Sequence, residues 1–281
     1  MAKFIKKTVK AKSVVIYNTS DWHVGSRAFN DAAARTLVER VADEGAYLTF
    51  GGDAVEGKVT KSSHFDPKGL NDGEITIQDQ CNAFVDILRP IAKRVLMVQT
   101  GNHEVYLKPD FDVIDYICRC LGTDDIYGHY QTWLELNGCT MHFWHGKPAM
   151  PRGAKDPIQR EANQRAWLKR KFEELAGSAQ AHYMGHTHHC LIQPPLDKYA
   201  LLNGGNDVHG VYFKEPMRDV NGMEYWHPDA RWYVNTGTLR RGGRFNYEDY
   251  SEIAGYNPPA ISCTKTTIVG DSIENIEKVM L

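Results

Sequence analysis

Apolar and polar positions in the first half of the chain follow two alternating patterns. Short apolar runs bounded by glycine and polar residues predict buried strands at residues 13–18, 46–50 and 95–99. Apolar residues at helical spacing predict helices over residues 31–44, from Ile77 to about Pro90, and over residues 113–121. This alternation of strands and helices is typical of a sheet with helices packed against it.

The second half of the chain has a more antiparallel pattern. The pair Asn137-Gly138 separates β-rich runs at 130–136 and 139–145 and predicts a two-residue hairpin. A helix is predicted from Asp156 to about Ala176, because Pro157 occupies its first position and Gly177 follows its end. Further strands are predicted at residues 181–184, 266–269 and 273–279.

These elements together predict a single domain over residues 1–281. Its fold class is α/β (α+β), with a two-sheet β-sandwich flanked by helices. A polar, glycine-bearing stretch at about 56–75 predicts a surface loop or lid, and an aromatic-rich β insertion is predicted at about 190–233.

Composition and charge exclude several classes of protein. The chain is 42% hydrophobic and 24% charged, which argues against disorder, a coiled coil or a collagen-like repeat. A net charge of -2 argues against general binding of polyanions or membranes. No apolar run is long enough to span a bilayer, residues 1–12 lack the apolar core of a secretory signal, and the six cysteines lack zinc-site spacing. We therefore expect a cytoplasmic protein with free thiols and no membrane association.

Candidate chemistry lies where the predicted strands end. The polar clusters are Asp21-Trp22-His23, Gly51-Gly52-Asp53, Gly101-Asn102-His103-Glu104, His145-Gly146 and Gly185-His186-Thr187-His188. Residues i and i+2 of an extended chain point to the same side, so Asp21 can aim with His23, and His186 with His188. Taken singly, Asp, Asn and Gly at these places fit ordinary turns equally well. Ordinary turns do not explain five histidines in this order.

The ligand types in these clusters suit divalent metals. Carboxylates, an amide oxygen and imidazoles without thiolate fit Mn²⁺, Fe, Zn²⁺, Mg²⁺ or Ni²⁺. Seven such ligands are too many for one tetrahedral ion but suit two ions about 3.5–4 Å apart. Asp53 is the central candidate to bridge them, because one carboxylate has two oxygens.

The order of these motifs resembles the calcineurin-like metallophosphoesterases. The resemblance covers roughly residues 13–240 and includes Asn235-Thr236-Gly237-Thr238-Leu239, which is similar to the family's NPGS-type turn with Thr236 in the usual place of proline. It implies a four-layer α/β/β/α fold and two divalent metal ions, with Mn the first choice. One ion would be held by Asp21, His23, Asp53 and His188, and the other by Asp53, Asn102, His145 and His186.

The resemblance also implies a reaction. A water activated between the two cations attacks the phosphate ester, and His103 contacts the phosphate and protonates the leaving oxygen. Read without the resemblance, His103 could be a structural histidine, but its place within Gly101-Asn102-His103-Glu104 favours a catalytic role. Glu104 is expected to orient neighbouring loops or a ligand rather than to bind metal directly.

The substrate is less clearly indicated. Residues 152–171 carry a local charge of +5 that could guide a phosphate backbone, although a solvated helix face is slightly favoured. Residues 199–256 are rich in aromatics, with Arg240 and Arg241 nearby; base stacking is one interpretation, and an aromatic β-core is favoured. Asn102, His103, Arg152, Arg240 and Arg241 are the candidate substrate-binding residues.

The opening motif bears on the kind of ester. Residues 20–25 are similar to the opening motif of the nuclease branch of the family, the SbcD-like exonucleases, whereas residues 52–57 depart from the Asp-rich run of that branch. On the similarity of residues 20–25, we expect a phosphodiesterase acting on nucleic acid or nucleotides. We expect no obligate protein partner. A phosphomonoesterase and a non-catalytic binding module are the alternatives.

Overall fold

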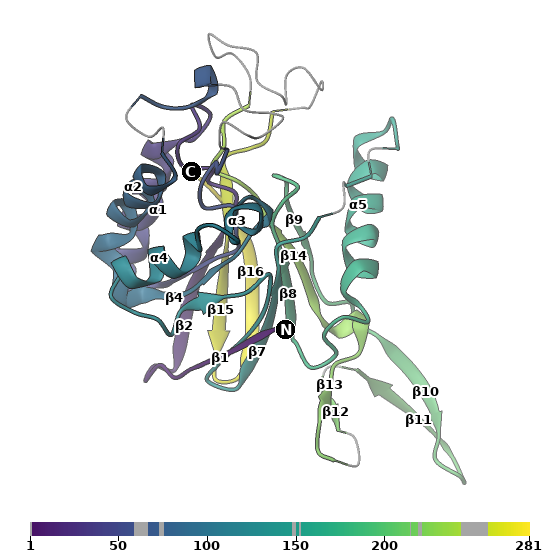
Figure 1. Cartoon of the computed structure of the whole chain (residues 1–281). Coiled ribbons are helices and arrows are strands. Elements are labelled where there is room, and N and C mark those ends of the chain that lie inside the picture. Colours follow the sequence, from purple (N-terminus) through teal and green to yellow (C-terminus); the bar gives the residue numbers. More distant parts are fainter. Residues whose placement is uncertain are drawn as a thin grey trace.

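Two six-stranded sheets with helices on their outer faces form the body of the protein (Figure 1). The computed structural model describes residues 2–58, 67–72, 76–147, 150–151, 153–213, 215–218, 221–242 and 258–281. The predicted fold class is confirmed, because both sheets and the flanking helices are present. The predicted lid at about 56–75 falls partly outside the described residues, which omit 59–66 and 73–75.

The first sheet has the strand order β16-β15-β2-β3-β4-β5. Strands β2, β3, β4 and β5 are parallel to one another, and β15 and β16 extend the sheet beside β2 in antiparallel fashion. The strands are β2 (Ser13–Thr19), β3 (Tyr47–Phe50), β4 (Val95–Gln99), β5 (Tyr127–Gly128), β15 (Ser262–Val269) and β16 (Ser272–Met280).

The second sheet has the order β1-β6-β7-β8-β14-β9. Here β7, β8 and β14 run parallel to one another, and β6 and β9 pair with them in antiparallel fashion. The strands are β1 (Lys3–Lys7), β6 (Gln131–Leu136), β7 (Cys139–Trp144), β8 (Ala181–Met184), β9 (Cys190–Gln193) and β14 (Trp232–Thr236).

Three apolar clusters hold the layers together. The first lies between the first sheet and α1, α2 and α4, and the second lies between the two sheets. The third packs α5 against the second sheet through Leu168 and Phe172. The helices are α1 (Asp31–Asp43), α2 (Ile77–Leu88), α3 (Asn102–Leu107), α4 (Val113–Cys120) and α5 (Pro157–Phe172), and the short 3₁₀ turns are η1 (Pro67–Gly69), η2 (Arg89–Arg94) and η3 (Pro228–Ala230).

The predicted helices begin at side-chain caps. Asn30, Thr76, Asp112 and Asp156 each accept a hydrogen bond from a backbone N–H of the first turn that follows. Helix α5 is shorter than predicted and ends at Phe172, the last apolar residue that it buries against the second sheet. The elements β1, α3 and β5 were not predicted, because β1 buries only Ile5, α3 has six residues and β5 has two.

The predicted hairpin at Asn137-Gly138 is confirmed. It joins β6 to β7, and the backbone φ angles of Asn137 and Gly138 are 53° and 90°. A tight two-residue turn needs positive φ at both central residues, and asparagine and glycine tolerate that conformation best.

The chain between β9 and β14 forms two separate two-stranded sheets. They consist of β10 (Tyr199–Asn203) with β11 (Val208–Tyr212), and of β12 (Met217–Arg218) with β13 (Glu224–Tyr225). Figure 1 shows both extending from the body. The favoured interpretation of this region as aromatic core is wrong for Tyr199, Tyr212 and Tyr225, which are exposed, although Tyr233 of β14 is buried.

The basic segment forms α5, where carboxylates offset several of its charges. Arg165 pairs with Glu161 at 2.6 Å, and Lys169 pairs with Asp229 of η3. All six cysteines are free. Among the described residues, no helix combines the length and apolar character needed to cross a membrane.

A buried histidine pair in the second sheet gives the fold a pH dependence. His142 and His182 lie against Phe172, their Nδ1 atoms are 3.3 Å apart, and both side chains are fully buried. Burial lowers the pKa of His142 to about 4, and burial together with His142 and Arg231 lowers that of His182. Below about pH 6.5 the unfolded chain takes up protons that the folded chain does not. The stability of the fold therefore decreases as the pH is lowered.

We expect the free energy of unfolding to fall by about 3 kcal/mol between pH 6.5 and 4 through His142 alone. Urea unfolding at pH 6.5 and at pH 4 measures this loss. The variant His142→Phe keeps an aromatic ring beside Phe172 but removes the titrating group, so it should lose less stability over the same interval. Equal losses in both proteins would contradict the assignment.

Candidate metal centre

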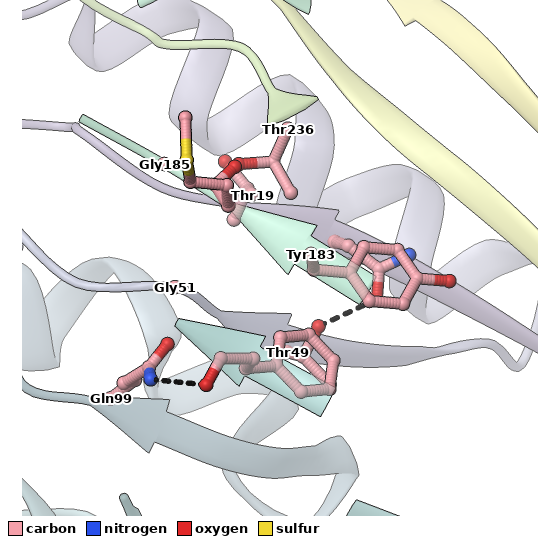
Figure 2. Close-up of a pocket in the computed structure, with 10 residues that line it drawn as sticks. Thr19, Thr49, Gly51, Gln99, Tyr183, Gly185 and Thr236 are labelled. Atoms are coloured by element: carbon pink, nitrogen blue, oxygen red, sulfur yellow. Dashed lines mark hydrogen bonds between the residues drawn. The ribbon is translucent and has the colours of Figure 1, made fainter. Parts of the chain in front are cut away.

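The predicted polar clusters meet at one edge of the sandwich. Strands β2, β3 and β4 of the first sheet and β7 and β8 of the second each end directly before one of them. Figure 2 shows residues from both sheets that line a small space between them; Thr19 and Gly51 belong to the ends of β2 and β3 in the first sheet, and Gly185 and Thr236 to the ends of β8 and β14 in the second. Parallel strands end at a common edge, so residues far apart in the sequence are brought together.

Buried hydrogen bonds join the two sheets beneath the clusters. The Gln99 side-chain amide donates to the Phe143 carbonyl at 3.0 Å, which connects β4 to β7. Asn18 donates to Thr266 at 2.8 Å, and the Thr266 hydroxyl also bonds Tyr183 of the second sheet at 2.7 Å. These bonds fix how the two sets of strand ends face each other.

Three groups of metal-ligating atoms lie at this edge. They are Asp21, His23 and His188; Asp53, His145 and His186; and His23, Asp53 and His103, with the ligand atoms of each group within 4.8 Å of one another. Each of the first two groups contains three of the four residues of one ligand set implied by the sequence resemblance. All seven predicted metal ligands therefore come together, because Asn102 also contacts the second group.

The second group is closely spaced around Asn102. The Asn102 side-chain oxygen lies 3.0 Å from Nε2 of His145 and 2.8 Å from Nδ1 of His186. Nε2 of His145 lies 3.1 Å from Oδ2 of Asp53. His145 donates its Nδ1 proton to the Gly51 carbonyl at 2.8 Å, which leaves Nε2 directed at the two oxygens.

The first group is similarly compact. Nε2 of His23 lies 3.2 Å from Nε2 of His188, which in turn lies 3.3 Å from Oδ1 of Asp21. Asp21 is fully buried, and its carboxylate accepts the backbone N–H of His186 at 3.0 Å. Asp21 therefore connects the loop after β2 to the loop after β8.

Five of these residues hold an unusual backbone conformation. Asp21, His23, Asp53, His186 and His188 all have positive φ, between 51° and 66°. Side chains other than glycine rarely adopt this region, and each occurrence costs about 1–3 kcal/mol. Of the described non-glycine residues with positive φ, Asn137 of the hairpin is the other one. Strain gathered at one point is a common feature of functional sites.

The residues fit a divalent metal centre. Their donors are carboxylate oxygens, an amide oxygen and imidazole nitrogens, the ligand types of Mn, Fe, Zn, Ni and Mg sites. The Asp53 carboxylate is buried, and it faces His145, His23 and His103. Despite burial, these histidines hold the pKa of Asp53 well below its usual range, so it is a carboxylate at neutral pH.

His103 lies beside the ligand groups. Its Nδ1 contacts the Glu56 carbonyl, and its backbone N–H donates to Oδ1 of Asp53 at 3.0 Å. Its Nε2 is 3.9 Å from Oδ2 of Asp53. Burial opposes the charged imidazole, but Asp53 and Glu56 outweigh it and raise the pKa of His103. His103 therefore lies beside the ligand groups with its side chain partly exposed.

Glu56 was not predicted as a site residue. Its buried carboxylate lies 3.2 Å from Nδ1 of His23 and 2.6 Å from Nζ of Lys58. The histidine contact lowers the pKa of Glu56 despite its burial. Glu56 thus positions His23 with its side chain and His103 with its carbonyl. The signal in the sequence was a carboxylate three residues after Asp53.

Glu104 orients loops, as the sequence predicts. Its carboxylate accepts backbone N–H groups from Gly101 at 2.7 Å, Asp53 at 3.1 Å, Ala54 at 2.7 Å and Val55 at 3.3 Å. Burial and the Asp53 carboxylate raise the pKa of Glu104 to about 7. The loops also approach closely, since a Cβ at Gly101 would lie 2.2 Å from the Asp53 backbone nitrogen.

We expect Glu104→Gln to destabilise the fold by about 1–3 kcal/mol, because the amide group turns a donor toward buried N–H groups that need an acceptor. Thermal or urea unfolding measures the loss, and Glu135→Gln, which removes a partly exposed partner of Lys6, is the control. Metal affinity should fall in Glu104→Gln, since Asp53 loses its support. If Glu104→Gln kept both the stability and the metal affinity of the wild type, the four hydrogen bonds to the Glu104 carboxylate would not be what holds the loop.

The turn at Asn235–Leu239 supports the centre from β14. Asn235 donates its side-chain amide to the Gly185 carbonyl at 3.1 Å and to the Thr187 hydroxyl at 2.7 Å. The Thr238 hydroxyl donates to the Asp21 carbonyl at 2.6 Å. The turn therefore joins the loops that carry Asp21, His186 and His188.

Two of the predicted substrate-binding arginines, Arg240 and Arg241, bond to residues other than the metal ligands. Arg240 forms a backbone bridge with Phe29, and its N–H donates to the Thr238 hydroxyl at 3.0 Å. Arg241 is exposed and donates to Asn30 at 2.7 Å. Arg152 lies outside the described residues.

Comparison with known proteins gives little beyond the structure itself. No family model matches the chain, and no curated protein matches it. Among solved structures, YfcE, a phosphoesterase from E. coli, is similar with a TM-score of 0.41 and 15% identity, over 94% of this chain and 98% of that one.

Proposed function

We propose that the protein is a metal-dependent phosphoesterase with a dinuclear centre. The observation that supports this proposal is the convergence of seven ligand side chains from five strand ends, with His103 beside them. Asp21, His23, Asp53 and His188 would hold one metal, and Asp53, Asn102, His145 and His186 the other. Manganese is the first candidate for both positions.

The chemistry divides between the metals and the chain's own residues. Bound divalent cations would supply an acidified water as nucleophile and positive charge for the phosphoryl oxygens. Nδ1 of His103 contacts the Glu56 carbonyl, which leaves Nε2 for the substrate. The raised pKa of His103 keeps a proton there near neutral pH, and this proton passes to the departing alkoxide oxygen.

The proposed substrates are phosphodiesters of nucleic acid or nucleotides. This choice is supported by the resemblance of residues 20–25 to the nuclease branch of the metallophosphoesterases. The arginines that follow the turn at Asn235–Leu239 are consistent with a long polyanionic substrate.

A panel of substrates tests the proposal. The purified protein is loaded with Mn²⁺, Ni²⁺ or Mg²⁺ and assayed with bis-p-nitrophenyl phosphate, p-nitrophenyl phosphate, cyclic nucleotides and single- and double-stranded DNA. We expect metal-dependent turnover of the diesters to exceed that of the monoester. Preference for p-nitrophenyl phosphate would indicate a phosphomonoesterase, and no turnover with any metal would indicate a binding module.

A further inference from the structure

A cavity of about 460 Å³ lies outside the metal centre, between α1, α2 and the segment around Asn71. This volume is within the range of small-ligand sites, about 300–1,000 Å³. Three guanidinium groups line the cavity, and they come from three separate parts of the chain: Arg27 from the loop after His23, Arg35 from α1, and Arg241 from the segment after β14.

The charge of this arginine-lined cavity favours an anion. Its lining holds three arginines and two aspartates. Asp31 pairs with Arg35 at 2.8 Å within α1, and Asp86 pairs at 3.0 Å with Arg89 of η2, so Arg27 and Arg241 carry the remaining positive charge of the lining. Arg241 is bonded to the neutral side chain of Asn30 at 2.7 Å. Because a guanidinium carries five N–H groups, such a bond leaves donors for a phosphate.

The pairing of Arg27 is also compatible with an anion. Its Nε donates to the Leu70 carbonyl at 2.9 Å, and its Nη2 lies 3.6 Å from the fully exposed carboxylate of Asp72. An exposed ion pair of this kind contributes little, about 0–1 kcal/mol, so a phosphate can replace it at small cost.

The lining suits a phosphate and sugar better than a base. Its apolar residues are Phe29, Ala83 and Ile87, of which Phe29 and Ile87 are buried and present little surface. Its polar groups are three guanidinium groups, one amide and two carboxylates, and guanidinium groups contact the backbone of a nucleic acid without reading its sequence.

The arginine-lined cavity is tied to the metal centre on two sides. Arg27 follows His23 by four residues, a span of at most about 14 Å, and Ser26 donates its backbone N–H to the His23 carbonyl at 2.9 Å. On the other side, the backbone N–H of Arg241 donates to the Ala28 carbonyl at 2.7 Å. Thr238, three residues before Arg241, donates its hydroxyl to the Asp21 carbonyl of the metal centre.

We propose that the arginine-lined cavity binds a backbone phosphate of the nucleic acid strand whose ester lies at the metal centre. This inference rests on the proposed phosphoesterase function for its substrate. It identifies the substrate as a strand of more than one nucleotide and gives Arg27, Arg35 and Arg241 the role of holding the phosphate next to the one that is hydrolysed.

The test is salt-dependent binding of a labelled single-stranded oligonucleotide, followed by fluorescence anisotropy. It uses the full chain with Mn²⁺ in a His103→Gln background, with a gel to verify that the probe stays intact. Arg27→Gln and Arg241→Gln should each weaken binding about five- to tenfold and reduce the slope of log K against log salt by about 0.7. The control is Arg119→Gln, which removes an exposed arginine paired with Asp115 on α4.

Two outcomes would overturn the inference: affinities and slopes equal to those of Arg119→Gln, or a loss seen with a mononucleotide probe but not with the oligonucleotide. Either can occur while the substrate panel still gives metal-dependent hydrolysis, in which case only the cavity assignment fails. If the panel shows no hydrolysis but the arginine variants still lose affinity and slope, the proposed function fails and the strand-binding cavity remains.

Discussion

Replacing Asp53 by asparagine is expected to lower phosphoesterase activity by about 1,000-fold or more, since a metal centre supplies several kcal/mol of barrier reduction. Asp53 belongs to two of the three ligand groups, and its Oδ2 is 3.1 Å from His145. The asparagine is nearly the same size but lacks the charge and the second oxygen acceptor. Both proposed metal positions should therefore weaken together.

Metal content per chain, measured after dialysis, and kcat/KM together check this prediction. Wild type is expected to retain two ions and Asp53→Asn one or none. Asp229→Asn is the matched control, because Asp229 is also a largely buried, ion-paired aspartate but lies beside Lys169 and Lys198 rather than at the centre. If Asp53→Asn kept both ions and wild-type kcat/KM, the proposed centre would be rejected.

The variant His103→Gln is expected to keep its metals and lose about 10²–10⁴-fold in kcat, the usual contribution of a positioned acid. The glutamine can still fill the space beside Asp53 and the Glu56 carbonyl, but it cannot transfer a proton. His103 also belongs to a ligand group with His23 and Asp53, so a loss of bound metal would instead identify it as a ligand.

The leaving group separates these two roles. A nitrophenolate departs without protonation, whereas the alkoxide of a nucleotide ester needs a proton. His103→Gln should therefore lose much more activity on a dinucleotide than on bis-p-nitrophenyl phosphate. Equal losses on both substrates would argue against general acid catalysis by His103.

The sequence predicts most of the ligand set because the residues follow strand ends. Asp21, Asp53 and His186 each come within three residues of the end of a buried apolar strand, and a parallel sheet places such positions at a common edge. Local patterns were sufficient to find both the strands and the residues after them.

Other parts of the site depend on contacts that local patterns do not encode. Glu56 faces His23 across 33 residues of sequence, and nothing in its neighbourhood marks it as buried. The arginine-lined cavity joins Arg27 to Arg241 from opposite ends of the chain. The exposure of Tyr199 and Tyr212 was also missed, because β propensity indicates a strand but not what covers it.

The support given by Glu104 and by the turn at Asn235–Leu239 has a consequence for cofactor exchange. These hydrogen bonds hold the ligand loops through backbone groups, so the position of Asp53 and Asp21 does not depend on which cation they bind. One divalent ion should replace another without refolding of the loops. The identity of the working metal would then follow cellular supply and ligand preference rather than the shape of the protein.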